Sequence, residues 1–348
     1  MTILLIIDVH THFVPEHLPS MAGRTGGDLW PVTKCVCGKA NHKHVMIAGK
    51  NFRTITDQCW SPRQRITDMD QEDVTIQVLS PMPELLSYWF KAEDTLDFAR
   101  QINSQLSQFI ESNPDRFWGL GMLPLQDPEL AAKEIKRLKN EFGLQGVEVG
   151  THINGKSIGD PFFSPFFAEA ESEGISIFIH ALHPLGNDRI VGPPSLAALI
   201  GFPTENAIAI ATLITGGILE KYPKLKIFVS HGGGTISSIL PRLTYGWETM
   251  DDVRKICPQP PSYYAKQIYY DTLVYDVNAV NYLMDTVGPS QLMIGSDYPF
   301  AIREKYPGHW LDELNLSQEE KNGVKHQNAL KFFGKFNQLS LSDRTLKK

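Results

Sequence analysis

Eight short runs of apolar and β-branched residues recur along the chain, separated by intervals long enough for a helix. Several runs are apolar almost throughout, as expected for strands that are covered on both faces in a parallel sheet. The runs cover residues 3–9, 75–79, 118–123, 146–150, 176–179, 226–230, 268–272 and 292–295. Strands that alternate with helices in this way predict an α/β fold, specifically a (β/α)8 TIM barrel. A doubly wound sheet is the alternative.

Helix signals fill several of these intervals. Residues 95–112 carry apolar side chains at helical spacing and stop before Asn113-Pro114. Residues 128–140 follow Asp127, a good N-cap, and have a proline in the first turn. Three further helices are predicted at 204–220, 236–247 and 277–286.

A single barrel accommodates a chain of 348 residues, so one domain is expected over residues 1–340, with a polar tail over 341–348. Residues 14–63 separate the first strand from its helix by far more than an ordinary loop. Their glycine, proline and polar content predicts an inserted loop or small subdomain over the barrel mouth. Such loops usually serve the active site.

Composition argues against several partners. The net charge is −6, the pI is near 6.0, and basic residues are scattered, which disfavours nucleic acid and anionic membranes. Four cysteines are too few for a disulfide framework. The first ten residues lack a basic region and end in Asp-Val-His, so they predict a strand rather than a signal peptide. No run approaches the roughly 18–20 apolar residues of a membrane span. A reduced, cytoplasmic protein is expected.

Five chemically capable side chains follow the predicted strands. His10 and His12 end the first run, His180 the fifth and His231 the sixth, and Asp297 follows the eighth. In a TIM barrel the active site lies at the C-terminal ends of the strands. An extended His-x-His places both rings on one face, and imidazole and carboxylate are ligands that zinc accepts. The sequence therefore predicts one catalytic metal ion.

Alternatives remain open for these positions. His183 competes with His180, because HALHP leaves the strand register undecided, and His152 is expected to line the mouth. His180 alone is compatible with a core histidine, and Asp297 with a turn cap. The fourth run, Gly146–Gly150, has no lysine that could be carbamylated to bridge two metals, so one ion is expected rather than two.

His231 lies in SHGGG, where glycines let the backbone pass close to a ligand. Beside the metal, its imidazole is expected to act as a base toward a bound water whose pKa the metal lowers to about 7. A fifth ligand or a structural histidine are the alternatives.

The inserted segment carries a second group of possible ligands, Cys35, Cys37, His42 and His44. Their spacing is not that of a standard zinc finger. A β-hairpin that turns near Gly38 is therefore favoured over a second, structural zinc site.

Motifs spread over nearly the whole chain, from about residue 5 to about residue 335, resemble a known family. In order they are DVHTHFVP, NFR…CWSPRQRITDMD, LPLQDPELAAKEI, FIH, SHGGGTISSILPR and IGSDYPF. This set resembles the α-amino-β-carboxymuconate-ε-semialdehyde decarboxylase family, in the decarboxylase branch of the amidohydrolase superfamily. The resemblance implies one zinc ion per subunit, bound by His10, His12, His180 and Asp297, and water activation by His231.

The resemblance also implies roles for two arginines. Arg53, in the inserted segment, matches an arginine that binds a substrate carboxylate. Arg242 matches one that reaches the neighbouring subunit's site, which requires a homodimer. Two guanidinium groups suit a dicarboxylate. The segment 181–200 departs from the family, because HALHPLGNDRIVGPPSLAALIG replaces its tryptophan-containing stretches. A reshaped substrate pocket is expected.

Together these features predict a metal-dependent, non-oxidative decarboxylase. Its expected substrate is an unsaturated or aromatic carboxylic acid from aromatic catabolism, with His231 and Asp297 as catalytic residues. A hydrolase of an amide, lactone or amine that uses the same activated water is the alternative. A metal-dependent sensor without catalytic activity is a third interpretation.

Overall fold

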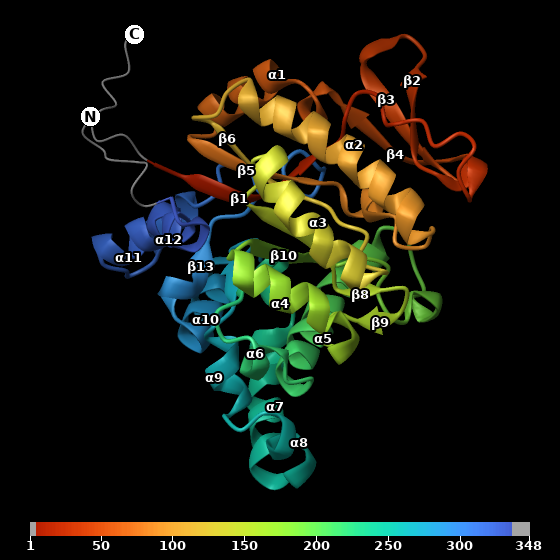
Figure 1. The fold of residues 1–348 in the computed structure, drawn as a ribbon. Coiled ribbons are helices and arrows are strands. Elements are labelled where there is room, and N and C mark those ends of the chain that lie inside the picture. The colour runs from red at the N-terminus through yellow and green to blue at the C-terminus, as the bar shows by residue number, and fades with distance from the viewer. Residues whose placement is uncertain (1–4, 336–348) are drawn as a thin grey trace.

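A computed structural model describes residues 5–335 (Figure 1). The start of the first predicted run, at residues 3 and 4, and the predicted tail over 341–348 lie outside the described residues.

Eight parallel strands form one sheet in the order β1-β5-β6-β7-β10-β11-β12-β13. The sheet closes between its first and last strands, because Val9 N–H donates to Ile294 O (2.8 Å) and His12 N–H to Tyr298 O (2.7 Å). The predicted (β/α)8 barrel is confirmed, and the doubly wound alternative is wrong. The strands are β1 (Ile7–Phe13), β5 (Ile76–Pro81), β6 (Phe117–Gly121), β7 (Gly146–Gly150), β10 (Ser176–His180), β11 (Lys226–Val229), β12 (Tyr269–Asp271) and β13 (Leu292–Met293).

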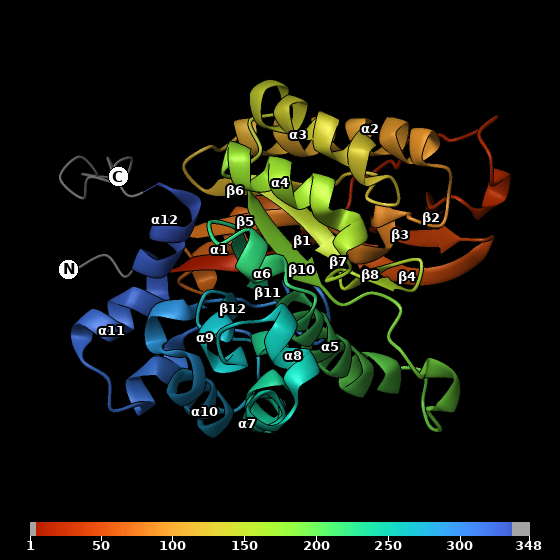
Figure 2. The same cartoon turned by 60° about the horizontal axis from the view of Figure 1, so that its bottom comes forward.

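Helices surround the strands (Figure 2). The Asp127 side chain caps α3 by accepting from Leu130 N–H at 3.0 Å, as the sequence predicts. The helix predicted over 204–220 is interrupted instead, because Gly217 adopts a left-handed φ of 77°. The main helices are α1 (Pro62–Gln71), α2 (Ala92–Glu111), α3 (Pro128–Glu141), α4 (Ser164–Glu173), α5 (Phe202–Thr215), α6 (Ile218–Lys221), α7 (Ile236–Thr249), α8 (Asp251–Ile256), α9 (Pro261–Ala265), α10 (Val277–Val287), α11 (Gln318–Asn322) and α12 (Asn328–Phe333).

Aromatic side chains fill the barrel interior below the predicted site, from Phe178, whose ring centroid lies 5.0 Å from that of His10, down to α12. The ring centroid of Phe228 lies 4.3 Å from that of Phe178 and 5.4 Å from that of Phe332 on α12. Trp118 packs against Phe333 of the same helix at 5.7 Å. All five side chains belong to one buried cluster, so α12 covers the floor of the barrel.

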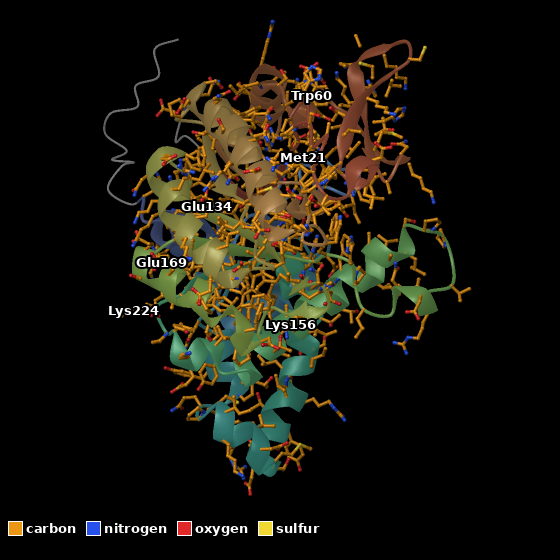
Figure 3. All side chains as sticks on the ribbon, turned by 45° about the vertical axis from the view of Figure 1, so that its right-hand side comes forward. Met21, Trp60, Glu134, Lys156, Glu169 and Lys224 are labelled. Atoms are coloured by element: carbon orange, nitrogen blue, oxygen red, sulfur yellow. The ribbon has the colours of Figure 1, made fainter. Side chains whose placement is uncertain are left out.

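The long insertion forms a three-stranded antiparallel sheet of β2 (Val32–Val36), β3 (Lys39–Ile47) and β4 (Lys50–Thr56). Met21 and Trp60 belong to the barrel's large apolar core or pack on it, and both lie between this sheet and the barrel helices (Figure 3). The insertion is therefore anchored on the barrel.

One helical stretch contradicts the expectation that no apolar segment is long enough to span a membrane. Ala197–Thr215, which continues into α5, is long and apolar enough to cross a membrane by length and composition, among the residues that the structure describes. Its Ala207, Ile210 and Leu213 are nevertheless buried in the barrel core. Core helices of soluble proteins pass the same test, so this stretch is weak evidence for a membrane.

Candidate metal and substrate site

Four buried side chains converge at the C-terminal ends of the strands. His10 and His12 come from β1, His180 from the last position of β10, and Asp297 from the segment after β13. One ligand atom from each lies within 4.8 Å of all the others. The structure therefore brings together the four predicted ligands, close enough to share one ion.

The rivals of this group lie outside it. His183 is exposed, adopts φ 45° and has its ring 5.1 Å from that of Trp89. His152 is hydrogen-bonded through Nε2 to the carbonyl oxygen of His183, at 2.9 Å. Both side chains thus belong to the rim of the barrel rather than to the cluster.

The hydrogen bonds of the cluster leave the Nε2 atoms of His10 and His180 facing its centre. His10 Nδ1 contacts Asp271 Oδ2 at 2.6 Å, which turns its Nε2 toward His12 Nε2 at 3.1 Å. His180 Nδ1 contacts Ala181 O at 2.9 Å, and its buried Nε2 has no hydrogen-bond partner among the described residues. Because an unpaired buried nitrogen is costly, a cation at the centre fits this donor set.

The charge states also suit a metal. Burial lowers the pKa of His12 to about 4 and holds that of His180 well below its usual value, so both rings are neutral. Burial opposes ionisation of Asp297, but its hydrogen bond with His12 and the nearby imidazoles lower its pKa to about 2. Neutral imidazole and ionised carboxylate are the forms that bind divalent ions.

His10 behaves differently from the other two histidines. Burial opposes its protonation, but the hydrogen bond to Asp271 and the surrounding carboxylates raise its pKa to about 9. A cation that binds to its Nε2 must therefore displace a proton, so metal binding is expected to release one.

Asp271, the last residue of β12, was not anticipated from the sequence. Besides His10, it accepts the backbone N–H of His231 at 2.9 Å and that of Gly232 at 2.8 Å. It therefore links one metal-facing histidine to the loop that carries His231. The signal was present, because this carboxylate lies in the predicted run 268–272 at a strand end.

His231 lies beside the four-residue group, with its ring centroid 5.1 Å from that of His180. Asn206 Nδ2 donates to Ser230 O at 2.8 Å and lies 3.3 Å from His231 Nδ1, so the ring is held next to α5. Burial lowers the pKa of His231, so the ring is neutral. His231 and Asp297 both adopt left-handed backbone conformations, with φ of 53° and 64°, as strained residues at functional sites often do.

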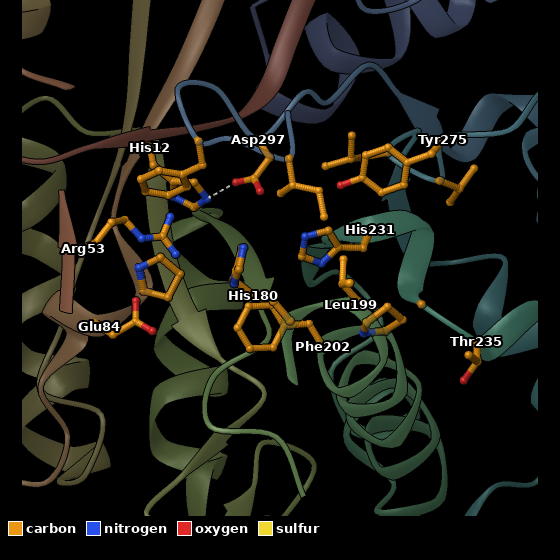
Figure 4. A pocket seen from close by; sticks show the side chains of 18 residues that line it. His12, Arg53, Glu84, His180, Leu199, Phe202, His231, Thr235, Tyr275 and Asp297 are labelled. Atoms are coloured by element: carbon orange, nitrogen blue, oxygen red, sulfur yellow. Dashed lines mark ion pairs between the residues drawn. The ribbon is translucent and has the colours of Figure 1, made fainter. Parts of the chain in front are cut away.

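A cavity of about 480 Å³ opens above these side chains (Figure 4). Arg53 of β4 lines it, with its guanidinium carbon 3.9 Å from the ring centroid of Phe300. The insertion thus places Arg53 in the cavity wall, and its role in binding a substrate carboxylate stays a prediction. The lining residues are His12, Arg53, Pro83, Glu84, His180, Ala198, Leu199, Phe202, Pro203, His231, Gly234, Thr235, Leu273, Val274, Tyr275, Asp297, Phe300 and Ile302.

The cavity wall also includes residues from the divergent segment 181–200 and one residue that was not predicted, and it lacks Arg242. Ala198 and Leu199, from the segment that departs from the family pattern, form part of its wall. Glu84, which lies just after β5, was missed although it too follows a strand end. Arg242 on α7 is exposed and does not line the cavity of its own chain.

The cysteines and histidines of the insertion lie on a hairpin that turns at Gly38, whose φ is 73°, as favoured from the sequence. Cys35 and Cys37 are exposed, and His44 Nδ1 contacts Thr54 Oγ1 at 2.9 Å. Within residues 5–335, the cluster at the barrel mouth is the one group whose ligand atoms lie close enough for a metal. A second zinc site in the hairpin is not supported.

Residues 7–335 match the amidohydrolase family model. The chain therefore belongs to the amidohydrolase family. It is 37% identical to a 2-amino-3-carboxymuconate-6-semialdehyde decarboxylase from Dictyostelium discoideum, over 95% of this chain and 92% of that protein. The enzyme of that name from Caenorhabditis elegans is 29% identical over 93% of each chain. These relatives agree with the resemblance drawn from the motifs.

A solved structure shares the fold. The dihydroxybenzoic acid decarboxylase of Polaromonas sp. JS666, with bound manganese and the inhibitor 2-nitroresorcinol, superposes with a TM-score of 0.76. It is 20% identical and covers 94% of this chain and 96% of its own.

Proposed function

We propose that the chain is a metal-dependent, non-oxidative decarboxylase of an unsaturated or aromatic carboxylic acid. The observation that carries this proposal is the buried group of three imidazoles and one carboxylate at the base of a cavity that also holds Arg53 and His231. Relatives that the chain matches over nearly their whole length are named as decarboxylases, which favours this reaction over hydrolysis.

Zinc is the ion that we propose for His10, His12, His180 and Asp297. Three imidazole nitrogens and one carboxylate oxygen form a ligand set that zinc accepts. Manganese is the competing candidate, because the Polaromonas structure contains it. When bound, a divalent ion supplies Lewis-acid stabilisation of negative charge and lowers the pKa of water. Metal analysis of the purified protein, followed by removal and restoration of each ion, tests the assignment.

The side chains of the cavity have complementary tasks in this proposal. Arg53 binds a substrate carboxylate, for which its guanidinium is suited by charge and by paired N–H donors. The neutral His231 ring first takes a proton from water, and the resulting imidazolium gives a proton to the carbon that bears the departing carboxylate. The bond between this carbon and the carboxylate then breaks and CO₂ leaves, so that a hydrogen replaces the lost group.

Product analysis separates decarboxylation from hydrolysis. The metal-loaded protein is incubated with a panel of muconate-semialdehyde and hydroxybenzoate acids, and released CO₂ is trapped. We expect CO₂ without release of a second acid or ammonia. Release of acid or ammonia from amide, lactone or amine substrates, with no CO₂ from any carboxylate, would establish the hydrolase instead.

Arg53→Ala tests the role of the insertion in substrate binding. Loss of a hydrogen-bonded charge should raise KM by about 10- to 100-fold, because such bonds contribute roughly 1.5–3 kcal/mol. The zinc content should stay that of the wild type, since Arg53 is not part of the four-residue group. Loss of zinc in this variant would contradict the assignment.

We also propose a homodimer in which Arg242 enters the partner's site. Arg242 is exposed and outside its own cavity, as such a role requires. Exposed apolar side chains lie on the same helix, namely Ile239 and Tyr245, and Met250 and Ile256 are exposed at the two ends of α8. Their burial in a subunit interface would account for this apolar surface.

A further inference from the structure

Glu84 is a carboxylic acid in the cavity wall that the proposed reaction does not use. It lies in a single 3-10 turn, Pro83–Leu86, directly after β5, and only 8% of it is exposed. It lines the same cavity as Arg53, His12 and Asp297. Buried carboxyl groups are rare unless they are paired, so this position requires an explanation.

The Glu84 carboxyl group has no side-chain partner in the described part of the chain. It forms no ion pair, and no other residue donates a hydrogen bond to it. Burial raises its pKa, and the nearby Arg53 and its own backbone amide only partly oppose this effect. The carboxyl group therefore retains hydrogen-bonding capacity that a molecule in the cavity can satisfy.

The position of Glu84 shows which part of a bound molecule its carboxyl group would meet. Figure 4 shows Glu84 and Arg53 on the same side of the cavity, across from His231 and Tyr275. Much of the remaining wall is apolar, with Leu199, Phe202 and other hydrophobic side chains. A ligand whose carboxylate meets Arg53 thus places a neighbouring substituent within the region that Glu84 faces.

We propose that Glu84 is a specificity-determining residue that accepts a hydrogen bond from an amino or hydroxyl group of the substrate. This inference rests on the proposed function for the identity of the site and deepens it. Arg53 offers hydrogen-bond donors and Glu84 offers an acceptor. Together they match a planar acid whose carboxylate meets Arg53 and whose N–H or O–H group meets Glu84. An acid with a methyl group in place of the donor would leave the buried Glu84 unpaired, which is unfavourable.

The test is direct binding, measured by calorimetry with metal-loaded protein. The probes are the three isomers of aminobenzoic acid and of hydroxybenzoic acid, each compared with the methylbenzoic acid of the same substitution. We expect the wild-type protein to bind at least one donor-bearing isomer about 10- to 100-fold more tightly than its methyl counterpart. Glu84→Val should reduce this ratio to near one, and Glu84→Gln, which keeps an acceptor oxygen, should retain part of it.

Glu304→Gln is the matched control. Glu304 is also a glutamate with a raised pKa and is partly buried, but it does not line the cavity. Its substitution should leave the donor-to-methyl ratio unchanged, and metal content and thermal unfolding confirm that all variants are folded.

Two results would overturn the proposal. One is a wild-type protein that binds no donor-bearing isomer more tightly than its methyl counterpart, and the other is a Glu84→Val variant with an unchanged ratio. Because the readout is binding, it is independent of turnover. A protein that releases no CO₂ but binds donor-bearing acids more tightly, in a way that depends on Glu84, would refute the proposed reaction while supporting this inference.

Discussion

At the scale of single residues, the site depends on hydrogen bonds that fix which nitrogen of each imidazole faces the centre. His10 and His180 each use Nδ1 for a partner outside the cluster, Asp271 in one case and a backbone carbonyl in the other. Their Nε2 atoms are thereby held toward one point. Such outer partners usually contribute substantially to metal affinity.

Asp271→Asn should therefore weaken metal binding by about 10- to 100-fold. An amide cannot match the charge-assisted hydrogen bond that the carboxylate makes to His10. Competition with a chromophoric chelator measures the affinity, and denaturant unfolding of the metal-free protein measures any structural loss. Unchanged metal affinity would show that Asp271 serves only the His231 loop.

At the scale of elements, the loop after β11 is the most constrained. Gly234 has φ 64°, and a Cβ atom there would lie 1.8 Å from the carbonyl oxygen of Pro203 on α5. No side chain can be accommodated without moving the helix that forms part of the cavity wall. The glycines of SHGGG are thus required by packing between two elements as well as by access to a ligand.

Gly234→Ala is expected to lower the free energy of unfolding by at least about 2 kcal/mol, through backbone strain and the clash with Pro203. Gly246→Ala is the matched control, since a Cβ atom at Gly246 meets nothing within 4 Å and the residue lies inside α7. That change should raise stability by roughly 0.5–1 kcal/mol. Equal effects at the two positions, measured by denaturant titration, would contradict this account.

A second prediction at this scale concerns the segment after β13. Burial, with the charge of Asp8, raises the pKa of Glu304 from its ordinary 4.5 to about 8. The folded protein therefore keeps this proton at pH values where the unfolded chain has lost it. The contribution of Glu304 to stability should fall as the pH rises from about 4.5 to about 8.

Glu304→Gln should remove this contribution. The difference in unfolding free energy between the wild type and the variant should shift in favour of the variant between about pH 5 and pH 8. A difference that does not change with pH would show that the carboxyl group is ionised in the folded protein.

The elements also show how far a sequence can be interpreted. The strands and their order in a barrel follow from apolar runs, and residues at strand ends follow from the barrel. Gly217 limits such reasoning, because a single left-handed glycine interrupts a helix whose apolar pattern continues. Asp271 and Glu84 were missed because the role of a carboxylate at a strand end depends on which residues lie next to it in space, and the sequence does not show this. Arg53 was identified by resemblance, since its position on the inserted sheet has no local signal.

At the scale of the whole molecule, the proposed dimer predicts complementation between two inactive variants. His231→Ala should lack the proton donor, and Arg242→Ala should lack the cation supplied to the partner. A mixed dimer has one intact site, formed by His231 of one subunit and Arg242 of the other. Random pairing makes half of the dimers mixed, so refolded mixtures should recover about a quarter of the wild-type rate.

The measurement compares each variant alone with the mixture, after subunit exchange has been verified by differently tagged chains. Activity that stays at the level of the single variants, in mixtures shown to contain mixed dimers, would place Arg242 outside the neighbouring site.

The aromatic side chains of α12 determine the route by which substrate and products enter and leave the barrel. Because Phe332 and Phe333 pack against Phe228 and Trp118 beneath the strands, the barrel is sealed at that end. The carboxylic acid substrate must therefore enter, and CO₂ and the organic product must leave, through the opposite end of the barrel, beside the inserted sheet. A bulky molecule bound at that opening would slow the release of CO₂ as well as the entry of the next substrate molecule.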